Sequence, residues 1–187
     1  MRIVAGAHRG RPIVAPKGQA TRPTGERARQ AVFNILAHAA FAPDLAGARV
    51  IDLFAGSGAL GLEALSRGAS FCLFVETDPA ARGIINENLE SLGLFGSARV
   101  HRRDATALGL RPAADGPPFD LAFLDPPYGT SLGELALASL LAGDWLTSDA
   151  LTVFECAADE PAIDIPGFEA VDTRRYGAAQ VLFLRRA

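Results

Sequence analysis

The sequence predicts a doubly wound α/β domain, in which helices cover both faces of a mostly parallel β-sheet. Short apolar runs alternate with stretches of helical periodicity from residue 49 onward. These runs are apolar almost throughout, as is typical of strands that are buried on both faces. The chain closes with two further apolar runs around a tyrosine–glycine turn, and this pattern predicts an antiparallel hairpin.

Seven strands are expected in this sheet, and helices separate most of the first five. The predicted strands cover residues 49–54, 71–76, 98–101, 119–124, 151–156, 170–175 and 180–185. The predicted helices between them cover residues 59–67, 79–92 and 132–141. Asp78 before Pro79 supports the second of these helices, since proline suits the first helical position behind a capping residue.

An additional N-terminal unit precedes the sheet. Two short β-runs, residues 2–5 and 12–15, flank a glycine-containing turn at residues 6–10 and predict a β-hairpin. Residues 17–23 resemble a loop. Thr24 is a suitable N-cap for a helix from about residue 25 to residue 41, which Pro43 would end.

The length of the chain predicts a single domain. Its 187 residues lie within the usual range of about 100–200 residues per domain. Residues 1–23 form the arm and loop, and residues 24–187 form the helix and the core. No apolar run approaches the roughly 18 residues of a membrane span, and the start lacks the apolar stretch of a signal peptide. Cys72 and Cys156 are expected to be buried free thiols, with no metal site.

Charge is distributed unevenly along the chain. The net charge of -3 does not suggest a nucleic-acid-binding protein. Residues 1–29, however, carry seven basic residues and one acidic residue (net +6), whereas the remainder carries 11 basic and 20 acidic residues (net -9). A basic arm of this kind favours an anionic partner.

A glycine-rich loop follows the first predicted strand. Gly56, Gly58 and Gly61 match the pattern G-x-G-x-x-G, in which glycine lets the backbone approach a ligand and the next helix offers its N-terminal amides. Glu76 lies 20 residues after Gly56, at the end of the second strand, where a carboxylate can accept both hydroxyls of a ribose. These features alone fit a dinucleotide-binding fold as well as a methyltransferase.

Two further acids favour S-adenosylmethionine as the cofactor. Asp52 precedes the loop, where a carboxylate suits the cationic methionine end of a sulfonium, and Asp104 follows the third strand, where it can accept the adenine amino group. One acid beside each of three successive strands is a specific pattern. The expected cofactor contacts from this region are Asp52, Phe54, Ala55, Gly56, Ser57, Gly58, Glu76, Thr77, Asp104 and Ala105.

The fourth strand runs into Asp125-Pro126-Pro127-Tyr128, the most specific signal in the chain. Two prolines make a stiff turn, which would hold the Asp125 carboxylate and a neighbouring carbonyl in place. An exocyclic amino nitrogen is a poor nucleophile because its lone pair is delocalised. Two fixed acceptors can hold its hydrogens and orient the lone pair toward a methyl donor. The Tyr128 ring could stack on a base that has left its stack.

At these residues the chain resembles the class I S-adenosylmethionine-dependent methyltransferases with a Rossmann-like fold and an (Asp/Asn)-Pro-Pro-(Tyr/Phe) motif. More narrowly, it resembles the bacterial 16S ribosomal RNA guanine-N2 methyltransferases. The segments that carry the resemblance are residues 6–11, 22–36, 52–68 and 125–128. The resemblance implies a cytoplasmic enzyme that modifies one guanine of 16S rRNA, in an assembled or assembling small ribosomal subunit.

The resemblance also implies roles for residues of the arm and the first helix. Arg22 and Thr24 would line the cofactor and target pocket, and Arg9, Arg11 and Arg22 would contact RNA phosphates. The sequence departs from the family pattern at Gly25, Glu26, Ala28 and Gln30. These departures leave the cofactor motifs intact. A monomer is expected, since no long exposed apolar stripe is evident.

Three alternatives remain open at this point. Another amino-methyltransferase, acting on DNA adenine or protein glutamine, would use the same catalytic motif, although no separate DNA-reading domain is expected at this length, which favours RNA. A nicotinamide-dependent oxidoreductase explains the glycines and Glu76 but not Asp125-Pro-Pro-Tyr, and Lys17 is the only lysine for a tyrosine–lysine pair. A catalytically silent RNA-binding module does not explain the intact acids and glycines.

Overall fold

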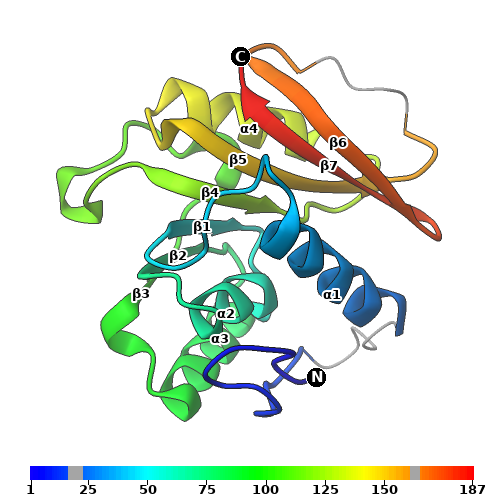
Figure 1. Ribbon diagram of the computed structural model, residues 1–187. Coiled ribbons are helices and arrows are strands. Elements are labelled where there is room, and N and C mark those ends of the chain that lie inside the picture. The colour runs from blue at the N-terminus through cyan, green and yellow to red at the C-terminus, as the bar shows by residue number, and fades with distance from the viewer. Residues whose placement is uncertain (17–22, 161–164) are drawn as a thin grey trace.

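The fold is built on one seven-stranded sheet with the strand order β3-β2-β1-β4-β5-β7-β6 (Figure 1). The structure is a computed structural model that describes residues 1–16, 23–160 and 165–187, and the side chains of residues 23–25 fall outside that description. The strands are Arg49–Leu53 (β1), Phe71–Val75 (β2), Ala98–His101 (β3), Phe119–Leu124 (β4), Leu146–Ala157 (β5), Phe168–Tyr176 (β6) and Ala179–Arg186 (β7). All seven predicted strands are therefore confirmed, and the two at 98–101 and 119–124 match residue for residue.

The first five strands are parallel, and the last two form the predicted antiparallel hairpin. β1 pairs with both β2 and β4, while β7 pairs antiparallel with β5 and with β6. The chain builds outward from β1 to β3 and then returns to place β4 on the other side of β1. Such a change of direction leaves a crevice beyond the carboxyl ends of the two strands, where open α/β sheets bind ligands.

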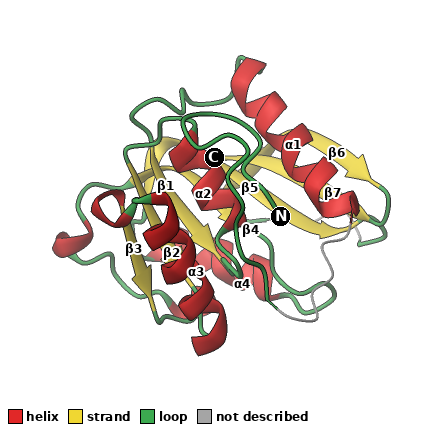
Figure 2. Ribbon diagram, turned by 90° about the horizontal axis from the view of Figure 1, so that it is seen from below, coloured by secondary structure: helices red, strands yellow, loops and turns green. Residues whose placement is uncertain are grey.

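Helices cover the sheet on both faces. α1 (Pro23–His38), α2 (Ala59–Ser66) and α3 (Pro79–Leu92) lie on one face, and α4 (Leu132–Ala142) lies on the other (Figures 1 and 2). Alternate residues of β1 and β2 enter two separate hydrophobic clusters: Val50 and Phe74 join the first, and Ile51 and Leu73 the second. This arrangement explains why the strands are apolar throughout their length.

The boundaries of α1 differ from the prediction. The helix begins at Pro23, so Thr24 is its second residue and the prediction that Thr24 caps it is wrong. Proline is favoured at the first position because the amide hydrogen that it lacks would have no helical partner there. The helix ends at His38, short of the predicted residue 41, and continues only as isolated turns such as the bond from Ala39 N to the Ile35 carbonyl.

β5 is longer than predicted, with 12 residues instead of the six at 151–156. Its first half contains the polar segment 147–149, which suggests a turn in the sequence. Leu146 pairs with Phe119, and a register shift follows before the regular pairing resumes at Leu151. The polar residues therefore lie on an extended stretch at the rim of the core.

The N-terminal β-hairpin is the main correction to the predicted fold. The described residues 1–16 pair antiparallel only at the Arg2–Pro12 bridge, with cross-turn bonds from Ile3 N to the Arg11 carbonyl and from Ile13 N to the Met1 carbonyl, so the predicted strands 2–5 and 12–15 do not extend along their full length. Beyond this pairing, the amides of Val4 and Ala5 bond the Glu63 carboxylate at 2.8 and 3.0 Å. The turn itself exists, and the arm docks on α2 and α3, as Figure 1 shows.

Within the described residues, no helix combines the length and the apolar character needed to cross a membrane. The same part of the chain has no group of three or more His, Cys, Asp or Glu residues that could hold a metal ion. Cys72 and Cys156 are buried free thiols, as predicted.

Candidate cofactor and active site

The register of the parallel strands brings the predicted site residues to one edge of the sheet. Leu53, the last residue of β1, pairs with Val75 of β2 and with Leu124 of β4, so the three strands end at the same level. The glycine loop, Glu76 and Asp125 therefore begin side by side. Asp125 and Glu76 lie close enough to Asp52 for their charges to raise its pKa.

The glycine loop uses backbone conformations that favour glycine. Gly56 and Gly58 have φ values of 54° and 77°, and Phe54, which is not a glycine, adopts a φ of 56°. A side chain in this region is strained. A Cβ added at Gly56 would meet no neighbouring atom closer than 3.9 Å, so the loop leaves open space for a ligand at that position.

Gly61 has a different role from the other two glycines of the motif. A Cβ at this position would lie 2.4 Å from Phe74 Cε1 and 2.6 Å from Cys72 Sγ, both buried on β2. The third glycine therefore permits close packing of α2 on the sheet, the role it has in G-x-G-x-x-G motifs generally.

Glu76 is held rigidly at the end of β2. Its Oε2 accepts the Gly56 amide at 2.8 Å, and its Oε1 accepts the Asp78 amide at 2.9 Å. The carboxylate is half-buried, and each oxygen retains a second lone pair for a ligand. Thr77, the next predicted contact, has an exposed side chain, and its carbonyl accepts from Arg82.

Asp52 lies beneath the loop. Its carboxyl is 2% exposed, and Oδ2 accepts the Gly61 amide at 3.0 Å. Burial raises the pKa of Asp52 well above its ordinary value, and the charges of Asp125 and Glu76 raise it further, against the effect of the Gly61 bond. In this position Asp52 supports the start of α2 and the loop above it.

Asp104 is an exposed helix cap. Its Oδ1 accepts both the amide of Thr106, at 2.8 Å, and the Thr106 hydroxyl, at 2.7 Å, at the start of a short 3₁₀ turn. These two bonds lower the pKa of the Asp104 carboxyl. Both bonds use Oδ1. Ala105 beside it is buried.

The Asp125–Tyr128 turn is held by polar contacts from several directions. The Tyr128 hydroxyl donates to Glu155 Oε1 at 2.5 Å, and the amide of Gly129 donates to Glu160 Oε1 at 2.9 Å. The Pro127 carbonyl accepts the Thr130 hydroxyl at 2.6 Å. The turn is therefore fixed by hydrogen bonds as well as by its prolines.

Asp125 is exposed to solvent directly after the end of β4, and protein atoms lie on several sides of its carboxyl. Desolvation by those atoms raises the pKa of Asp125 to about 7, and the charge of Glu155 contributes to the rise. A carboxyl with this pKa exchanges a proton near neutral pH, as a general base must.

Glu155 and Glu160 are site residues that the sequence analysis missed. Glu155 follows Phe154, which pairs with Leu124 directly before Asp125. The sequence could have indicated Glu155, because a residue one position after the level at which β4 ends lies at the ligand-binding edge of the sheet. It was obscured because Glu155 lies inside a predicted strand.

The structure separates the arm arginines from the cluster around Asp125. Arg9 and Arg11 are exposed at a turn held against the last residues of α2 and α3: Ala7 N bonds the Ser66 carbonyl, and Arg11 Nη2 bonds the Ser91 carbonyl. These helix ends lead into β2 and β3, so they lie at the amino edge of the sheet. Arg22 and the Thr24 side chain lie outside the described residues.

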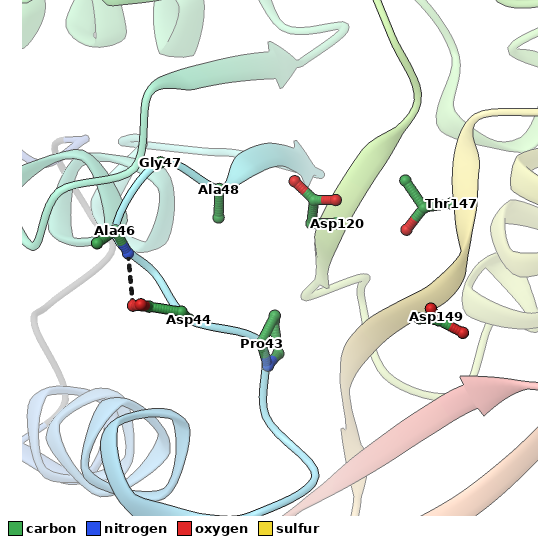
Figure 3. A pocket seen from close by; sticks show the side chains of 8 residues that line it. All are labelled: Pro43, Asp44, Ala46, Gly47, Ala48, Asp120, Thr147 and Asp149. Carbon is green, nitrogen blue, oxygen red and sulfur yellow. Dashed lines mark hydrogen bonds between the residues drawn. The ribbon is translucent and has the colours of Figure 1, made fainter.

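A pocket of about 420 Å³ lies at the amino edge of the sheet, near the beginnings of β1 and β4 (Figure 3). It is lined by Pro43, Asp44, Ala46, Gly47, Ala48, Asp120, Thr147 and Asp149. Two of its three acids already accept backbone amides, Asp44 from Ala46 and Asp120 from Arg49. The convergent glycines and perturbed acids lie at the opposite edge, which is therefore the candidate site.

Comparison with known proteins agrees with this geometry. Residues 1–185 match the family described as conserved hypothetical protein 95. Ribosomal RNA small subunit methyltransferase D of Haemophilus influenzae is 35% identical over 87% of this chain and 82% of its own length. The Escherichia coli protein of the same name is 37% identical over 89% of this chain and 79% of its own length.

A solved Escherichia coli structure, described as a candidate methyltransferase and named yhhF, superposes with a TM-score of 0.84 at 33% identity. The match spans 100% of this chain and 97% of the solved chain. The Rossmann-like methyltransferase fold that the resemblance implies is thus confirmed. Because the match extends over nearly the whole sequence, this chain belongs to the conserved hypothetical protein 95 family.

Proposed function

We propose that this chain is an S-adenosylmethionine-dependent methyltransferase that acts on the exocyclic N2 of a guanine in 16S ribosomal RNA. Its relatives from Haemophilus influenzae and Escherichia coli carry the name ribosomal RNA small subunit methyltransferase D. The observation that carries the proposal is the shared level of Leu53, Val75 and Leu124, which aligns the glycine loop, Glu76 and Asp125 along one crevice.

The residues along this crevice fit the cofactor. S-adenosylmethionine supplies an electrophilic methyl group on a sulfonium. The open space at Gly56 leaves room for the cofactor beside the loop, and the fixed Glu76 carboxylate is suited to a pair of ribose hydroxyls. Asp104 offers an exposed acceptor to the adenine amino group. The remaining contacts that we assign to the cofactor are Asp52, Phe54, Ala55, Ser57, Gly58, Thr77 and Ala105, with Arg22 and Thr24 from the first helix region.

The Asp125 turn would hold the target amino group. Two acceptors are needed for its two N–H donors, and the Asp125 carboxylate is one of them. We assign the second acceptor to the carbonyl of Pro126, the residue next to Asp125 in the stiff turn. Two fixed acceptors limit the rotation of the amino group and direct its lone pair toward the methyl group of the cofactor. Tyr128 offers its ring as a stacking surface.

Transfer would form the new N–C bond and break the S–C bond of the cofactor, with neutral S-adenosylhomocysteine as the leaving group. A proton must then leave the positively charged nitrogen. Asp125, with a pKa of about 7, is ionised in a large fraction of molecules at neutral pH and accepts that proton. The nitrogen then regains a neutral, conjugated lone pair. The Glu155 carboxylate, which holds the Tyr128 hydroxyl, stabilises the protonated form of Asp125 through its negative charge.

The charge distribution supports a large anionic substrate. The net charge of residues 1–29 is positive, and Arg9 and Arg11 lie at the edge of the sheet opposite to Asp125. An RNA that fills the crevice and also contacts these arginines must extend across the molecule, as a folded rRNA or a ribosomal particle does. We therefore assign Arg9, Arg11 and Arg22 to contacts with RNA phosphates. The substrate that we assign is the 16S rRNA in the small subunit or its precursor. We assign the enzyme to the cytoplasm, as a monomer of one domain.

Methyl transfer from radiolabelled S-adenosylmethionine tests the proposal. The purified protein is incubated with naked 16S rRNA, with small subunits that lack the modification, and with DNA, and the labelled nucleoside is identified by chromatography after digestion. We expect label in N2-methylguanosine, mainly from the small subunit. Label in N6-methyladenine, or no transfer to any of the three substrates, would refute the assignment.

A further inference from the structure

Asn88 is a buried polar residue in the middle of α3 that the proposed mechanism does not use. Only 1% of the surface of Asn88 is exposed to solvent. Asparagine is a weak helix former, and a buried amide is costly unless its polar atoms find partners. Asn88 meets this requirement with three hydrogen bonds that leave the helix: Oδ1 accepts Val14 N at 2.7 Å, and Nδ2 donates to Val14 O at 3.0 Å and to Ser57 O at 3.1 Å.

These three bonds connect two parts of the molecule with different roles. Val14 belongs to the returning end of the basic arm, whereas Ser57 is the middle residue of the Gly56–Gly58 turn. The Ser57–Gly58 peptide is held at both ends, since Asn88 binds its carbonyl and the Ala55 carbonyl accepts its N–H at 2.7 Å. The amide of Asn88 thus helps to set the orientation of a peptide plane in the cofactor loop.

Other contacts anchor the arm without reaching this loop. Glu63 binds the amides of Val4 and Ala5, and the Ser66 hydroxyl donates to the Ala5 carbonyl and accepts the amide of His8. Both residues belong to α2 and bind only the arm and neighbouring α2 groups. Among these anchors, Asn88 is the one whose side chain bonds the arm and the glycine loop together.

We propose that Asn88 is a positioning residue that couples the docking of the arm to the geometry of the cofactor loop, so that RNA and S-adenosylmethionine strengthen each other's binding. The proposal rests on the proposed function. RNA held by the arm stabilises the docked position of Val14, which keeps Asn88 oriented toward Ser57. By linkage, a cofactor that requires the ordered loop favours the docked arm by the same factor.

The coupling is measured as the factor by which saturating S-adenosylhomocysteine, which cannot react, tightens the binding of fluorescent 16S rRNA or small subunits. Coupling between binding sites is typically about 5–150-fold, and we expect the wild type to fall in this range. In Asn88→Ala the factor should fall to about one, and the affinity for S-adenosylhomocysteine measured calorimetrically without RNA should also fall.

Ser66→Ala is the matched control, because it removes two arm contacts without touching the glycine loop. It should weaken RNA binding and retain the coupling. Val14→Pro provides a second test at an exposed position of the arm, since proline removes the N–H that Asn88 Oδ1 accepts and leaves Asn88 itself in place. This variant should lose coupling while its affinity for S-adenosylhomocysteine without RNA remains that of the wild type. Circular dichroism establishes that each variant is folded.

Two outcomes overturn the proposal: wild-type coupling in both Asn88→Ala and Val14→Pro, or equal loss of coupling in Ser66→Ala. A wild-type protein that binds both ligands and transfers methyl groups, but shows no coupling, also refutes it while leaving the proposed function intact. A wild type that neither binds S-adenosylhomocysteine nor transfers methyl groups would instead refute the proposed function.

Discussion

At the scale of single residues, Asp125 and Glu155 form the chemical centre of the candidate site. Glu155 binds the Tyr128 hydroxyl, and its charge adds to the desolvation that raises the pKa of Asp125 to about 7. One side chain therefore affects both the position of the aromatic ring and the proton affinity of the proposed acceptor. Asp125 is the proposed proton acceptor, whereas Glu155 acts on it only through its charge and through Tyr128. Substitutions of the two residues should therefore have different effects on methyl transfer.

Asp125→Ala should abolish methyl transfer and leave cofactor binding largely unchanged. Loss of one preorganised polar group at a reacting centre typically costs about 100-fold or more in rate, and Asp125 lies on the substrate side of the crevice. Single-turnover transfer and calorimetric binding of S-adenosylhomocysteine measure the two effects. Asp149→Asn, at the opposite edge, is the control. Loss of binding together with activity would assign Asp125 a structural role.

Glu155→Gln should shift the pH dependence of methyl transfer toward lower pH. The folded pKa of Asp125 is raised, and its ionised form is the acceptor, so activity should rise as pH increases through about 7 and fall below it. Removal of the Glu155 charge lowers the pKa of Asp125 and moves the rising limb to more acidic pH. Transfer rates at saturating substrate across this range test the shift, with the exposed Glu169→Gln as control. An unmoved limb would contradict the proposed electrostatic coupling.

At the scale of secondary-structure elements, the packing of α2 on β2 positions the glycine loop. The helix begins directly after Gly58, and its first turn lies so close to the sheet that Gly61 cannot be replaced without displacing Phe74 or Cys72. The Asp52 carboxyl binds the Gly61 amide from below. The loop geometry is therefore a consequence of helix–sheet packing as well as of its own glycines.

Gly61→Ala should destabilise the protein by about 1–3 kcal/mol, the usual cost of overpacking a core. The added Cβ would lie within 2.6 Å of buried atoms of both Phe74 and Cys72. Gly83→Ala is a sharp control, because a Cβ at this position of α3 meets nothing within 4 Å. It should stabilise the protein by up to about 1 kcal/mol through helix propensity. Denaturant unfolding measures both variants, and equal stability of the two would contradict the packing argument.

Prediction of the elements succeeded where local signals and tertiary contacts agree. Asp78 and Pro79 begin α3 as expected, with Asp78 Oδ1 accepting the Ala80 amide at 3.0 Å. The N-terminal hairpin pairs over fewer residues than predicted, and the amides of Val4 and Ala5 bond the buried carboxylate of Glu63, a partner 59 and 58 residues away. No local pattern in residues 1–16 contains that information.

At the scale of the whole molecule, the turn of the basic arm that carries Arg9 and Arg11 lies at the edge of the sheet opposite to the crevice. The arm crosses α2 and α3, and its turn lies near the helix ends at the amino edge (Figure 1). A substrate contacted at both edges must span the domain. The arm arginines would then contribute affinity far from the reacting base, with little effect on the chemistry itself.

Arg9→Ala should weaken RNA binding without changing the affinity for S-adenosylhomocysteine. Loss of one phosphate contact should also reduce the slope of log affinity against log salt concentration by about one. RNA binding measured at several salt concentrations tests this expectation, and Arg186→Ala, an exposed arginine outside the arm, is the control. An unchanged slope in Arg9→Ala would remove Arg9 from the RNA-binding surface.

The strand–helix alternation, the closing hairpin and the motifs at the carboxyl ends of the strands follow from the order of residues, because apolar periodicity, glycine and proline act over a few residues. The fold is needed to show that the Gly56 loop, Glu76 and Asp125 begin at one level, that Glu155 lies beside them, and that Arg9 lies at the other edge. Strand register and helix docking set these relations, and both depend on contacts between residues far apart in the chain.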